Sequence, residues 1–456
     1  MFPVSQLPDD VSGRKLVGIF SQAQEGRLAQ RVKTAGGRLS AQQWQALAAI
    51  AQRFTPGTPL HLTTRQAIEL HDIAPEVICD VQQAVAEAGL SCVGACGDTY
   101  RNITICPCSG VRPGSVDLLP LAGMINAHLR RVEGIYHLPR KFKIALSCGP
   151  DCGQPWIHDI GLVVSDRDGS QGFDVIVAGS LGARPSTGMS LGWFPAEQGV
   201  ALIVAAVRVF AEHGDRDNRK KARLRHVRER MGDGPFTKVL MHAFEQVKNK
   251  RDWPKLGCQQ TDGGYPARAV LNFAHGDVTA AMAEALGQIQ SDGAFCVRIG
   301  PQHQVIVFGR DDARLGEKLA SFHALEAAAA AAATIVACPG DRWCGHGLVD
   351  TNRLADRVRA ELGGELPVGA AVCISGCPNG CSHTAVADVG LIGGRAMRDG
   401  RSEECFTVVV GGDMGRGPRL ADPLAKKLSA EQAIAEIRKY LRSGLSTKED
   451  HANVSR

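Results

Sequence analysis

Two stretches that repeat one pattern decide the fold: KIALSCGPDCGQPWIHDIGLVV (residues 143–164) and AVCISGCPNGCSHTAVADVGLIG (residues 371–393). Five residues of the first stretch recur in the second at one constant spacing along the chain: Cys148, Cys152, Asp159, Gly161 and Leu162 recur as Cys377, Cys381, Asp388, Gly390 and Leu391. Five identities in one register indicate a gene duplication. Each copy is expected to carry a larger α/β module.

A second pair of similar segments lies ahead of these stretches, at residues 36–54 and 275–290. In the first segment, Ser40 followed by Gln43 is a capping box, and the apolar residues after it follow helical spacing. In both copies two short strand-like runs follow the helix. The sequence therefore predicts a small α/β module and a larger one, each present twice. The interface between the copies is a natural place for a cofactor pocket.

At 456 residues the chain is too long for one hydrophobic core, and its fifteen cysteines are unusual. The opening MFPVSQLPDD does not read as a secretory signal, and no run of about 20 apolar residues could span a membrane. We therefore expect a soluble, cytoplasmic protein without a membrane partner, in which metal ligation explains some cysteines better than disulfides do. The alanine run at 327–333 is expected to form a helix, and the tail from about Thr447 to be disordered.

Four cysteines of the second half lie in two short loops rich in glycine and proline, as Cys338-x5-Cys344 and Cys377-x3-Cys381, with Cys373 close by. Such loops let backbone N–H groups approach the sulfurs of an iron–sulfur cluster. Zinc ligands usually have shorter spacing in both pairs, so the x5 pair argues against zinc. The spacing alone leaves a cluster, a zinc site and unrelated buried thiols open.

Positive charge gathers in the first half of the chain, on Arg31, Lys33, Arg65, Arg101 and the strand-like LPRKFK (residues 138–143). Alternation along a strand places Lys141 and Lys143 on one face, where they repel unless an anion lies between them. A solvated basic strand is the simpler interpretation, and an anionic cofactor or substrate is the other.

The basic run at 214–230 could contact nucleic acid, but it lacks interleaved aromatic residues.

The two copies have diverged. Constant spacing gives Val270 and Ala370 as the counterparts of Arg31 and Lys141, so one copy kept the cations and the other kept the better cysteine quartet. This is the pattern expected if two half-sites cooperate around one central pocket.

With these residues assembled, the sequence resembles the siroheme-dependent sulfite and nitrite reductase family. The resemblance runs from about Gly13 to Leu445 and rests on HLTTRQAIELH, RNITICP, LPRKFK, the Cys-x5-Cys pair and SGCPNGC followed by ADVGLIG. It implies an α+β, pseudo-twofold duplicated fold with two ferredoxin-like modules and two larger α/β siroheme-binding modules. The expected modules are residues 13–75 (ferredoxin-like), 76–255 (siroheme and substrate), 256–318 (ferredoxin-like) and 319–446 (cluster and siroheme).

The resemblance also implies a role for each matching residue. A [4Fe-4S] cluster would be held by Cys338, Cys344, Cys377 and Cys381, and Cys381 would also bridge to the siroheme iron. The substrate anion would be surrounded by four catalytic cations: Arg31, Arg101, Lys141 and Lys143. Siroheme would be contacted by Arg65, Arg216, Arg219, Lys220 and Asn379.

Some residues depart from the family pattern. The family often has Arg where this chain has His61, and Gln where it has Glu69; a carboxylate near a substrate anion is unfavourable unless it is protonated or paired. Four further cysteines lie near the duplicated positions of the cluster ligands: Cys106, Cys108, Cys148 and Cys152. They are either a relic of the duplication, with buried thiols, or a second metal centre.

The retained Lys141-x-Lys143 pair is sulfite-type within the family, so the expected reaction is the six-electron reduction of sulfite to sulfide. The alternative is reduction of nitrite to ammonia. A precorrin-3B synthase-like enzyme shares the fold but should not need the full set of cations, and a non-enzymatic iron–sulfur or nucleic-acid-binding protein is the remaining alternative.

No flavin- or nicotinamide-binding domain is visible. Electrons should therefore come from a separate donor, ferredoxin or a flavoprotein, and no nucleic-acid partner is expected.

Overall fold

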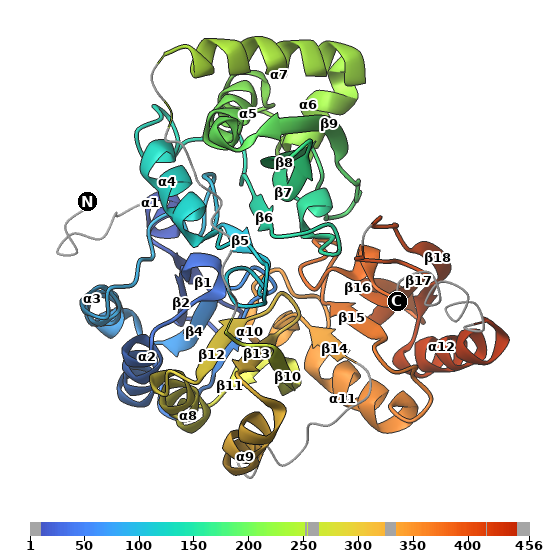
Figure 1. Cartoon of the computed structure of the whole chain (residues 1–456). Coiled ribbons are helices and arrows are strands. Elements are labelled where there is room, and N and C mark those ends of the chain that lie inside the picture. Colours follow the sequence, from blue (N-terminus) through green and yellow to red (C-terminus); the bar gives the residue numbers. More distant parts are fainter. Residues whose placement is uncertain (1–10, 251–252, 254–263, 324–333, 416, 445–456) are drawn as a thin grey trace. The chain divides into compact units, whose positions relative to one another are not determined.

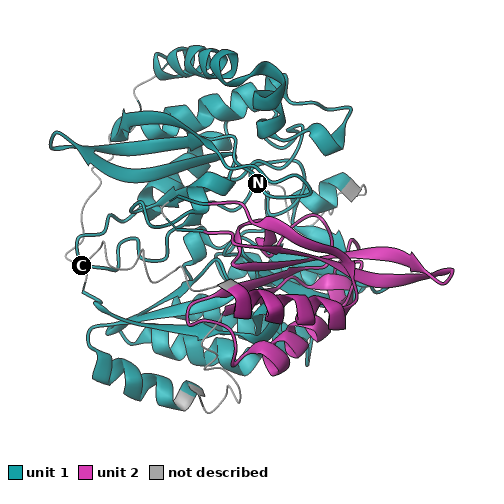
Figure 2. Ribbon diagram, turned by 90° about the vertical axis from the view of Figure 1, so that its right-hand side faces the viewer, with its two compact units in different colours: residues 1–329, 414–418 teal, residues 330–413, 419–456 magenta. Residues whose placement is uncertain are grey.

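The computed structural model describes residues 11–250, 253, 264–323, 334–415 and 417–444. The chain divides into two compact units: unit 1 comprises residues 1–329 and 414–418, and unit 2 comprises residues 330–413 and 419–456 (Figure 2). The helix expected at 327–333 and the tail from Thr447 lie outside the described residues. Within those residues, no helix combines the length and the apolar character needed to cross a membrane.

The first small module of unit 1 begins with helix α1 (Val11–Leu16). Its strands are β1 (Ile19–Ser21), β2 (Leu28–Val32), β3 (Leu60–Leu62) and β4 (Ile68–Ile73), and its other helices are α2 (Ala41–Phe54) and α3 (Ile78–Glu87). The sheet order is β1-β2-β4-β3-β11. Its last strand, β11 (Asp277–Val278), comes from the second small module and pairs antiparallel with β3.

The second small module contains β10 (Ala267–Asn272), β12 (Phe295–Ile299) and β13 (Gln304–Gly309), in the order β10-β13-β12, with α8 (Ala280–Ser291) and α9 (Asp312–His323). The apolar faces of both small modules pack into one core, in which Trp44 and Leu47 of α2 join Leu286 of α8. The boundary expected after residue 318 falls inside α9. The division into four modules stays a prediction.

The predicted duplication of the small module is visible in matching backbone details. The Ser40 side chain accepts a hydrogen bond from the Gln43 N–H and completes the predicted capping box at the start of α2. At the start of α8, the Thr279 side chain accepts one from the Met282 N–H. A short 3-10 turn precedes each helix, with a left-handed residue at Gly36 (φ 58°) in one copy and His275 (φ 57°) in the other.

Each larger module is built on a five-stranded sheet. In unit 1 the order is β5 (Thr104–Ile105), β6 (Ile144–Ser147), β7 (Ile160–Arg167), β8 (Ser170–Val177) and β9 (Met189–Pro195). In unit 2 it is β14 (Thr334–Ala337), β15 (Ala371–Ser375), β16 (Val389–Arg398), β17 (Arg401–Val410) and β18 (Asp422–Leu428). Both sheets begin with parallel pairs and end with antiparallel ones. The shared order confirms the predicted duplicated α+β architecture.

Helices cover these sheets. Unit 1 has α4 (Leu119–Leu129), α5 (Gly199–His213), α6 (Leu224–Met231) and α7 (Asp233–Lys248). In Figure 1, α5 lies between α7 and the green strands β7 and β8, which explains why nearly every side chain of its apolar sequence is buried. Unit 2 has the short α10 (Gly340–Trp343), α11 (Thr351–Leu362) and α12 (Ala430–Gly444), the last two packed on its sheet.

A duplicated aspartate fixes the strand that precedes each cysteine loop. Asp159 Oδ2 accepts a hydrogen bond of 2.7 Å from the Lys143 N–H, and Asp388 Oδ2 accepts one of 2.9 Å from the Ala371 N–H. Lys143 therefore corresponds to Ala371, and Lys141 to the residue before Ala370. The predicted equivalence of Lys141 with Ala370 is wrong by one position, because unit 2 has one extra residue, Gly376, between its strand and Cys377.

Candidate functional site

The predicted cluster ligands of unit 2 lie at the ends of neighbouring elements. Cys338 follows β14, Cys344 follows α10, and Cys377 and Cys381 lie in the loop after β15. Burial, and then the charge of the neighbouring Cys381 and Cys377, raise the pKa of Cys338 to about 12. A thiol in this position ionises only when a cation compensates it, which is the setting of a metal–thiolate ligand.

Backbone N–H groups point at these sulfurs. The Gly376 N–H donates to Cys338 Sγ at 3.1 Å, and the His346 N–H donates to Cys344 Sγ at 3.4 Å. The close approach depends on glycine: a Cβ on Gly376 would lie 2.9 Å from Gly340 Cα, and one on Gly340, where φ is +57°, would lie 2.3 Å from Thr351 Oγ1. Such donors stabilise the negative charge of a cluster.

Among the described residues, no three Cys, His, Asp or Glu side chains are arranged as ligands of a single metal ion. The x5 spacing of Cys338 and Cys344 argues against the zinc alternative for these loops, because zinc ligands usually have shorter spacing in both pairs. The ligands of a cubane bind four different irons and are spread more widely. The donor set of unit 2 therefore fits a [4Fe-4S] cluster.

Two predicted cations of unit 1 converge on one carbonyl oxygen. Arg31 Nη1 donates to the Ala95 oxygen at 3.3 Å, and Arg101 Nη1 donates to the same atom at 3.0 Å. The Arg31 Nη1 also contacts Cys96 Sγ at 3.1 Å, and Arg101 Nη2 donates to the Gly97 oxygen at 2.8 Å. The 94–97 loop thus holds both guanidinium groups side by side. The sequence pattern did not single out Cys96, since it has no counterpart among the repeated residues.

The cations of unit 1 are partly buried near one another and repel. Burial, and then the charges of Arg130, Arg101 and Arg65, lower the pKa of Lys33 to about 7. Burial, followed by the charge of Arg101, lowers the pKa of Arg65 to about 9, and burial also lowers the pKa of Arg101 to about 10. Such an excess of buried positive charge is stabilised by an anion. It fits a polycarboxylate such as siroheme together with an oxyanion, and it favours the anion-binding interpretation over a solvated basic strand.

Arg65 is held in a fixed orientation by its neighbours. Its Nη1 lies 2.6 Å from His158 Nε2, and its Nη2 donates to the Asn102 backbone oxygen. His158 Nδ1 in turn lies 2.5 Å from the Gln154 oxygen. Because a guanidinium can only donate, Nε2 of His158 is the acceptor and Nδ1 carries the proton. This chain of contacts presents Arg65 as a rigid cation.

The LPRKFK segment is not a regular strand, because β6 begins at Ile144 and only Phe142 forms an isolated bridge, with Tyr100. The predicted alternation holds for burial, since Phe142 is fully buried in the core of unit 1 whereas Lys141 and Lys143 are partly exposed. The Arg101 N–H donates to the Phe142 oxygen at 2.8 Å, and the Lys143 N–H is fixed by Asp159. Asp159 is fully buried and forms an ion pair of 2.7 Å with Arg223. The backbone that carries both lysines is therefore anchored at two points.

Glu69, the unexpected carboxylate, is paired with a predicted substrate cation. Its Oε1 lies 2.5 Å from Arg31 Nη2, and its Oε2 lies 3.3 Å from His71 Nε2. Burial alone would raise the pKa of Glu69, but the Arg31 guanidinium and the hydrogen bond from His71 hold it well below its usual range. The carboxylate is therefore ionised and neutralises Arg31. The other departure, His61, contacts Asp277 of β11 at 3.3 Å.

The remaining predicted siroheme contacts lie on the surface of their units. Arg216 donates to the backbone oxygens of His137 and Ala211, Arg219 forms an ion pair of 2.8 Å with Asp98, and Lys220 is exposed. Asn379 is exposed in the cysteine loop of unit 2. The basic run at 214–230 is not a bare patch, because it also contains three arginine–carboxylate pairs: Arg223–Asp159, Arg225–Glu229 and Arg228–Asp233.

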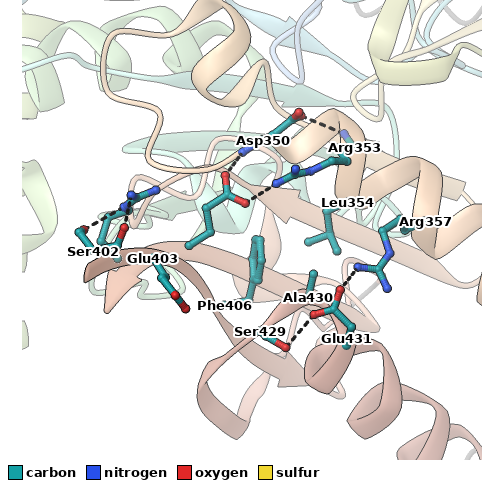
Figure 3. Close-up of a pocket in the computed structure, with 12 residues that line it drawn as sticks. Asp350, Arg353, Leu354, Arg357, Ser402, Glu403, Phe406, Ser429, Ala430 and Glu431 are labelled. Carbon is teal, nitrogen blue, oxygen red and sulfur yellow. Dashed lines mark hydrogen bonds and ion pairs between the residues drawn. The ribbon is translucent and has the colours of Figure 1, made fainter. Parts of the chain in front are cut away.

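A cavity of about 540 Å³ in unit 2 lies apart from the predicted residues. It is bordered by α11, the β16–β17 hairpin and the start of α12 (Figure 3). Its charges neutralise one another, with Arg353 2.6 Å from Glu404 and Arg357 2.5 Å from Glu431. None of the predicted site residues lines it. The cavity is therefore a surface hollow whose charged side chains are already paired with one another.

Comparison with known proteins decides the family. A family model described as the nitrite and sulphite reductase 4Fe-4S domain matches residues 96–248 and 328–443. The chain belongs to the nitrite and sulfite reductase family. A second model, the nitrite/sulfite reductase ferredoxin-like half domain, matches residues 20–88. The protein is thus an enzyme of the siroheme-dependent family, with siroheme and a [4Fe-4S] cluster as cofactors.

Both nitrite reductases and sulfite reductases are among the proteins that resemble this chain. An assimilatory ferredoxin-dependent nitrite reductase of Haloferax mediterranei is 30% identical over 474 residues, covering 93% of this chain and 80% of the relative. A sulfite reductase [ferredoxin] of Mycobacterium tuberculosis is 28% identical over 416 residues, covering 84% and 73%. The structure of the Mycobacterium tuberculosis NirA protein matches with a TM-score of 0.82 at 24% identity, over 94% of this chain and 86% of that one. The last comparison confirms the predicted fold.

Proposed function

We propose that this reductase converts sulfite to sulfide by six-electron reduction, with Arg31, Arg101, Lys141 and Lys143 as the cations that hold the anion. The observation that carries the proposal is Lys143. It is retained in the Lys-x-Lys pair, and its backbone is fixed by the fully buried Asp159. Two ammonium groups on one face of a strand can neutralise a dianion better than one can.

The proposed roles of the residues follow from their chemistry. When bound, siroheme and the cluster would supply electrons one at a time. Cys338, Cys344, Cys377 and Cys381 would hold the cluster, and Cys381 would also help to hold siroheme. Arg65, with Arg216, Arg219, Lys220 and Asn379, would contact siroheme. Arginine and lysine N–H groups would orient the oxyanion and donate hydrogen bonds to each oxygen as it leaves as water.

We infer that the electron donor is a separate protein of the ferredoxin type. The relatives from Haloferax mediterranei and Mycobacterium tuberculosis both carry ferredoxin in their names. The support is their likeness to this chain over most of its length. A flavoprotein donor is the alternative, and comparing reduction rates with each donor distinguishes the two.

Nitrite reduction is the second candidate, and the Arg31–Glu69 ion pair favours it. Glu69 neutralises one of the four proposed cations, so the site carries less positive charge than the cations alone would give. Sulfite can carry two negative charges and nitrite carries one. A less positive site therefore suits the monoanion better.

The test of the proposed preference is Lys143→Asn. With methyl viologen as donor, we expect kcat/KM for sulfite to fall by about tenfold or more, equivalent to about 1.4 kcal/mol, while that for nitrite falls less. The reason is that the second ammonium group matters more for a dianion. Lys248→Asn, a change in an exposed ion pair of α7, serves as the matched control. An unchanged ratio of the two activities would contradict the role of Lys143.

Replacing Glu69 by glutamine is expected to strengthen anion binding. The amide keeps a hydrogen-bond acceptor for Arg31 but removes the negative charge, so KM should fall by about fivefold, equivalent to about 1 kcal/mol, and more for sulfite than for nitrite. Steady-state kinetics with both anions measures the effect. Glu87→Gln, at an exposed carboxylate of α3, is the control. Equal KM values in the wild type and Glu69→Gln would show that Arg31 does not contact the anion.

A further inference from the structure

Unit 1 contains a second cluster of cysteines that the proposed reaction does not use. Cys106 and Cys108 lie directly after β5, and Cys148 and Cys152 lie in the loop after β6. All four are partly buried and free of disulfides. The structure brings them together, because the Cys106 thiol lies within interaction range of the thiols of Cys108, Cys148 and Cys152.

This arrangement leaves sulfur lone pairs without enough donors. A thiol has one proton, so Cys106 can satisfy only one of its three sulfur neighbours at a time. Sulfur is also a weak acceptor, which gives the protein little reason to gather four thiols for hydrogen bonding alone. Metal cations bound between the sulfurs would satisfy all four at once, since each thiolate is a strong ligand.

Three of the four cysteines occupy the positions of the cluster ligands of unit 2. The Cys106 N–H donates to the Leu146 oxygen at 2.9 Å, and the Cys338 N–H donates to the Ile374 oxygen at 3.0 Å. Since β5 pairs with β6 as β14 pairs with β15, Cys106 corresponds to Cys338. The repeated cysteines after the next strand complete the set, with Cys148 matching Cys377 and Cys152 matching Cys381.

The fourth ligand argues against a mere relic of the duplication. A relic would keep a cysteine at the position of Cys344, six residues after Cys338, but Arg112 stands six residues after Cys106. Cys108, which has no cysteine counterpart in unit 2, joins the other three instead. The quartet is therefore complete although one of its members has a different origin.

The surroundings suit a negatively charged centre. The Cys108 sulfur lies near the cations Arg112 and Arg268. The Cys152 sulfur is approached by the Gln154 backbone N–H and the Ser147 hydroxyl. The loop itself is braced, because the Ser115 hydroxyl donates to the Cys108 backbone oxygen at 3.0 Å. Cations and backbone donors of this kind stabilise thiolate clusters.

We propose that Cys106, Cys108, Cys148 and Cys152 hold a second iron–sulfur cluster, a one-electron carrier within unit 1. A cluster is preferred to a zinc ion because three of the four cysteines occupy the positions of the proposed cluster ligands of unit 2. The inference goes beyond the proposed function and does not depend on which anion is reduced. The cluster would accept one electron from the separate donor and return to its oxidised state by passing that electron on.

The test is metal analysis of the holoenzyme purified without oxygen. We expect about nine irons and about eight acid-labile sulfides per siroheme in the wild type, and about five and about four in Cys106→Ala/Cys108→Ser. Electron paramagnetic resonance of the dithionite-reduced protein should lose one cluster signal in this variant, with siroheme absorption retained. The Cys79→Ser control changes an exposed cysteine of α3 and should keep all nine irons.

Three outcomes would overturn the second cluster. One is about five irons per siroheme in the wild type, another is zinc in place of the additional iron, and the third is rapid alkylation of all four thiols in the native holoenzyme. Loss of siroheme from the double variant would signal a folding defect, and the wild-type iron count then decides. Failure of the proposed function is separate, because it would appear as missing reduction of both anions.

Discussion

Replacing Cys381 by serine is expected to abolish the reduction of both sulfite and nitrite. In the proposed assignment this residue would hold the cluster and help to hold siroheme, so its loss would interrupt electron delivery. We expect kcat with methyl viologen to fall by about a thousandfold or more, equivalent to about 4 kcal/mol. Visible absorption and iron analysis should show loss of the cluster. Because Cys381 is exposed, the substitution should have little effect on the stability of the fold.

The matched control for this experiment is Cys405→Ala. Cys405 is a buried cysteine of β17 in the same unit and belongs to neither quartet. It should keep the iron content and at least about half of the activity, with a modest loss of stability from the smaller side chain. A Cys381→Ser enzyme with full iron content and near-normal turnover would refute the assignment of this cysteine.

Replacing Asp159 by asparagine is expected to destabilise unit 1 strongly. The carboxylate is fully buried, receives a hydrogen bond from the Lys143 N–H at 2.7 Å, and is paired at 2.7 Å with Arg223, whose side chain is 10% exposed. Removing one partner of a buried pair leaves an uncompensated charge, at a cost of about 3–5 kcal/mol. Urea unfolding of wild type and variant, compared at equal cofactor loading, measures the loss.

The control for this prediction is Asp174→Asn. Asp174 forms an ion pair with Arg167 on the same sheet, but both side chains are well exposed, at 39% and 56%. Screening by water limits such a pair to about 0–1 kcal/mol. Equal effects of the two substitutions would show that the buried aspartate does not anchor the Lys143 strand.

Much of the fold could be predicted from the sequence because its signals are local. The Ser40 capping box, the helical spacing after it and the repeated cysteine loops each depend on residues close together in the chain. The duplication added a second, independent copy of every signal. The strand order within the sheets was not predicted, since no local pattern encodes it.

The details of the site were less predictable because they depend on contacts between distant residues. Glu69 was recognised as a departure, but its pairing with Arg31 needs the register of β2 against β4. The partly buried position of Lys33 among arginines has no periodic signal. The predicted equivalence of Lys141 with Ala370 was wrong by one residue. Unit 2 has one additional residue, Gly376, and an alignment at constant spacing cannot reveal such an insertion.

The strand β11 gives the second small module a place in the sheet of the first, where Asp277 and Val278 pair with His61 and Leu60. During synthesis, β3 therefore remains an unpaired edge strand until about 200 further residues have been translated. Contacts between residues so far apart in sequence slow folding, and an unprotected edge invites pairing with other chains. We therefore expect fragments that end before residue 277 to fold poorly, because they leave the edge of β3 unpaired.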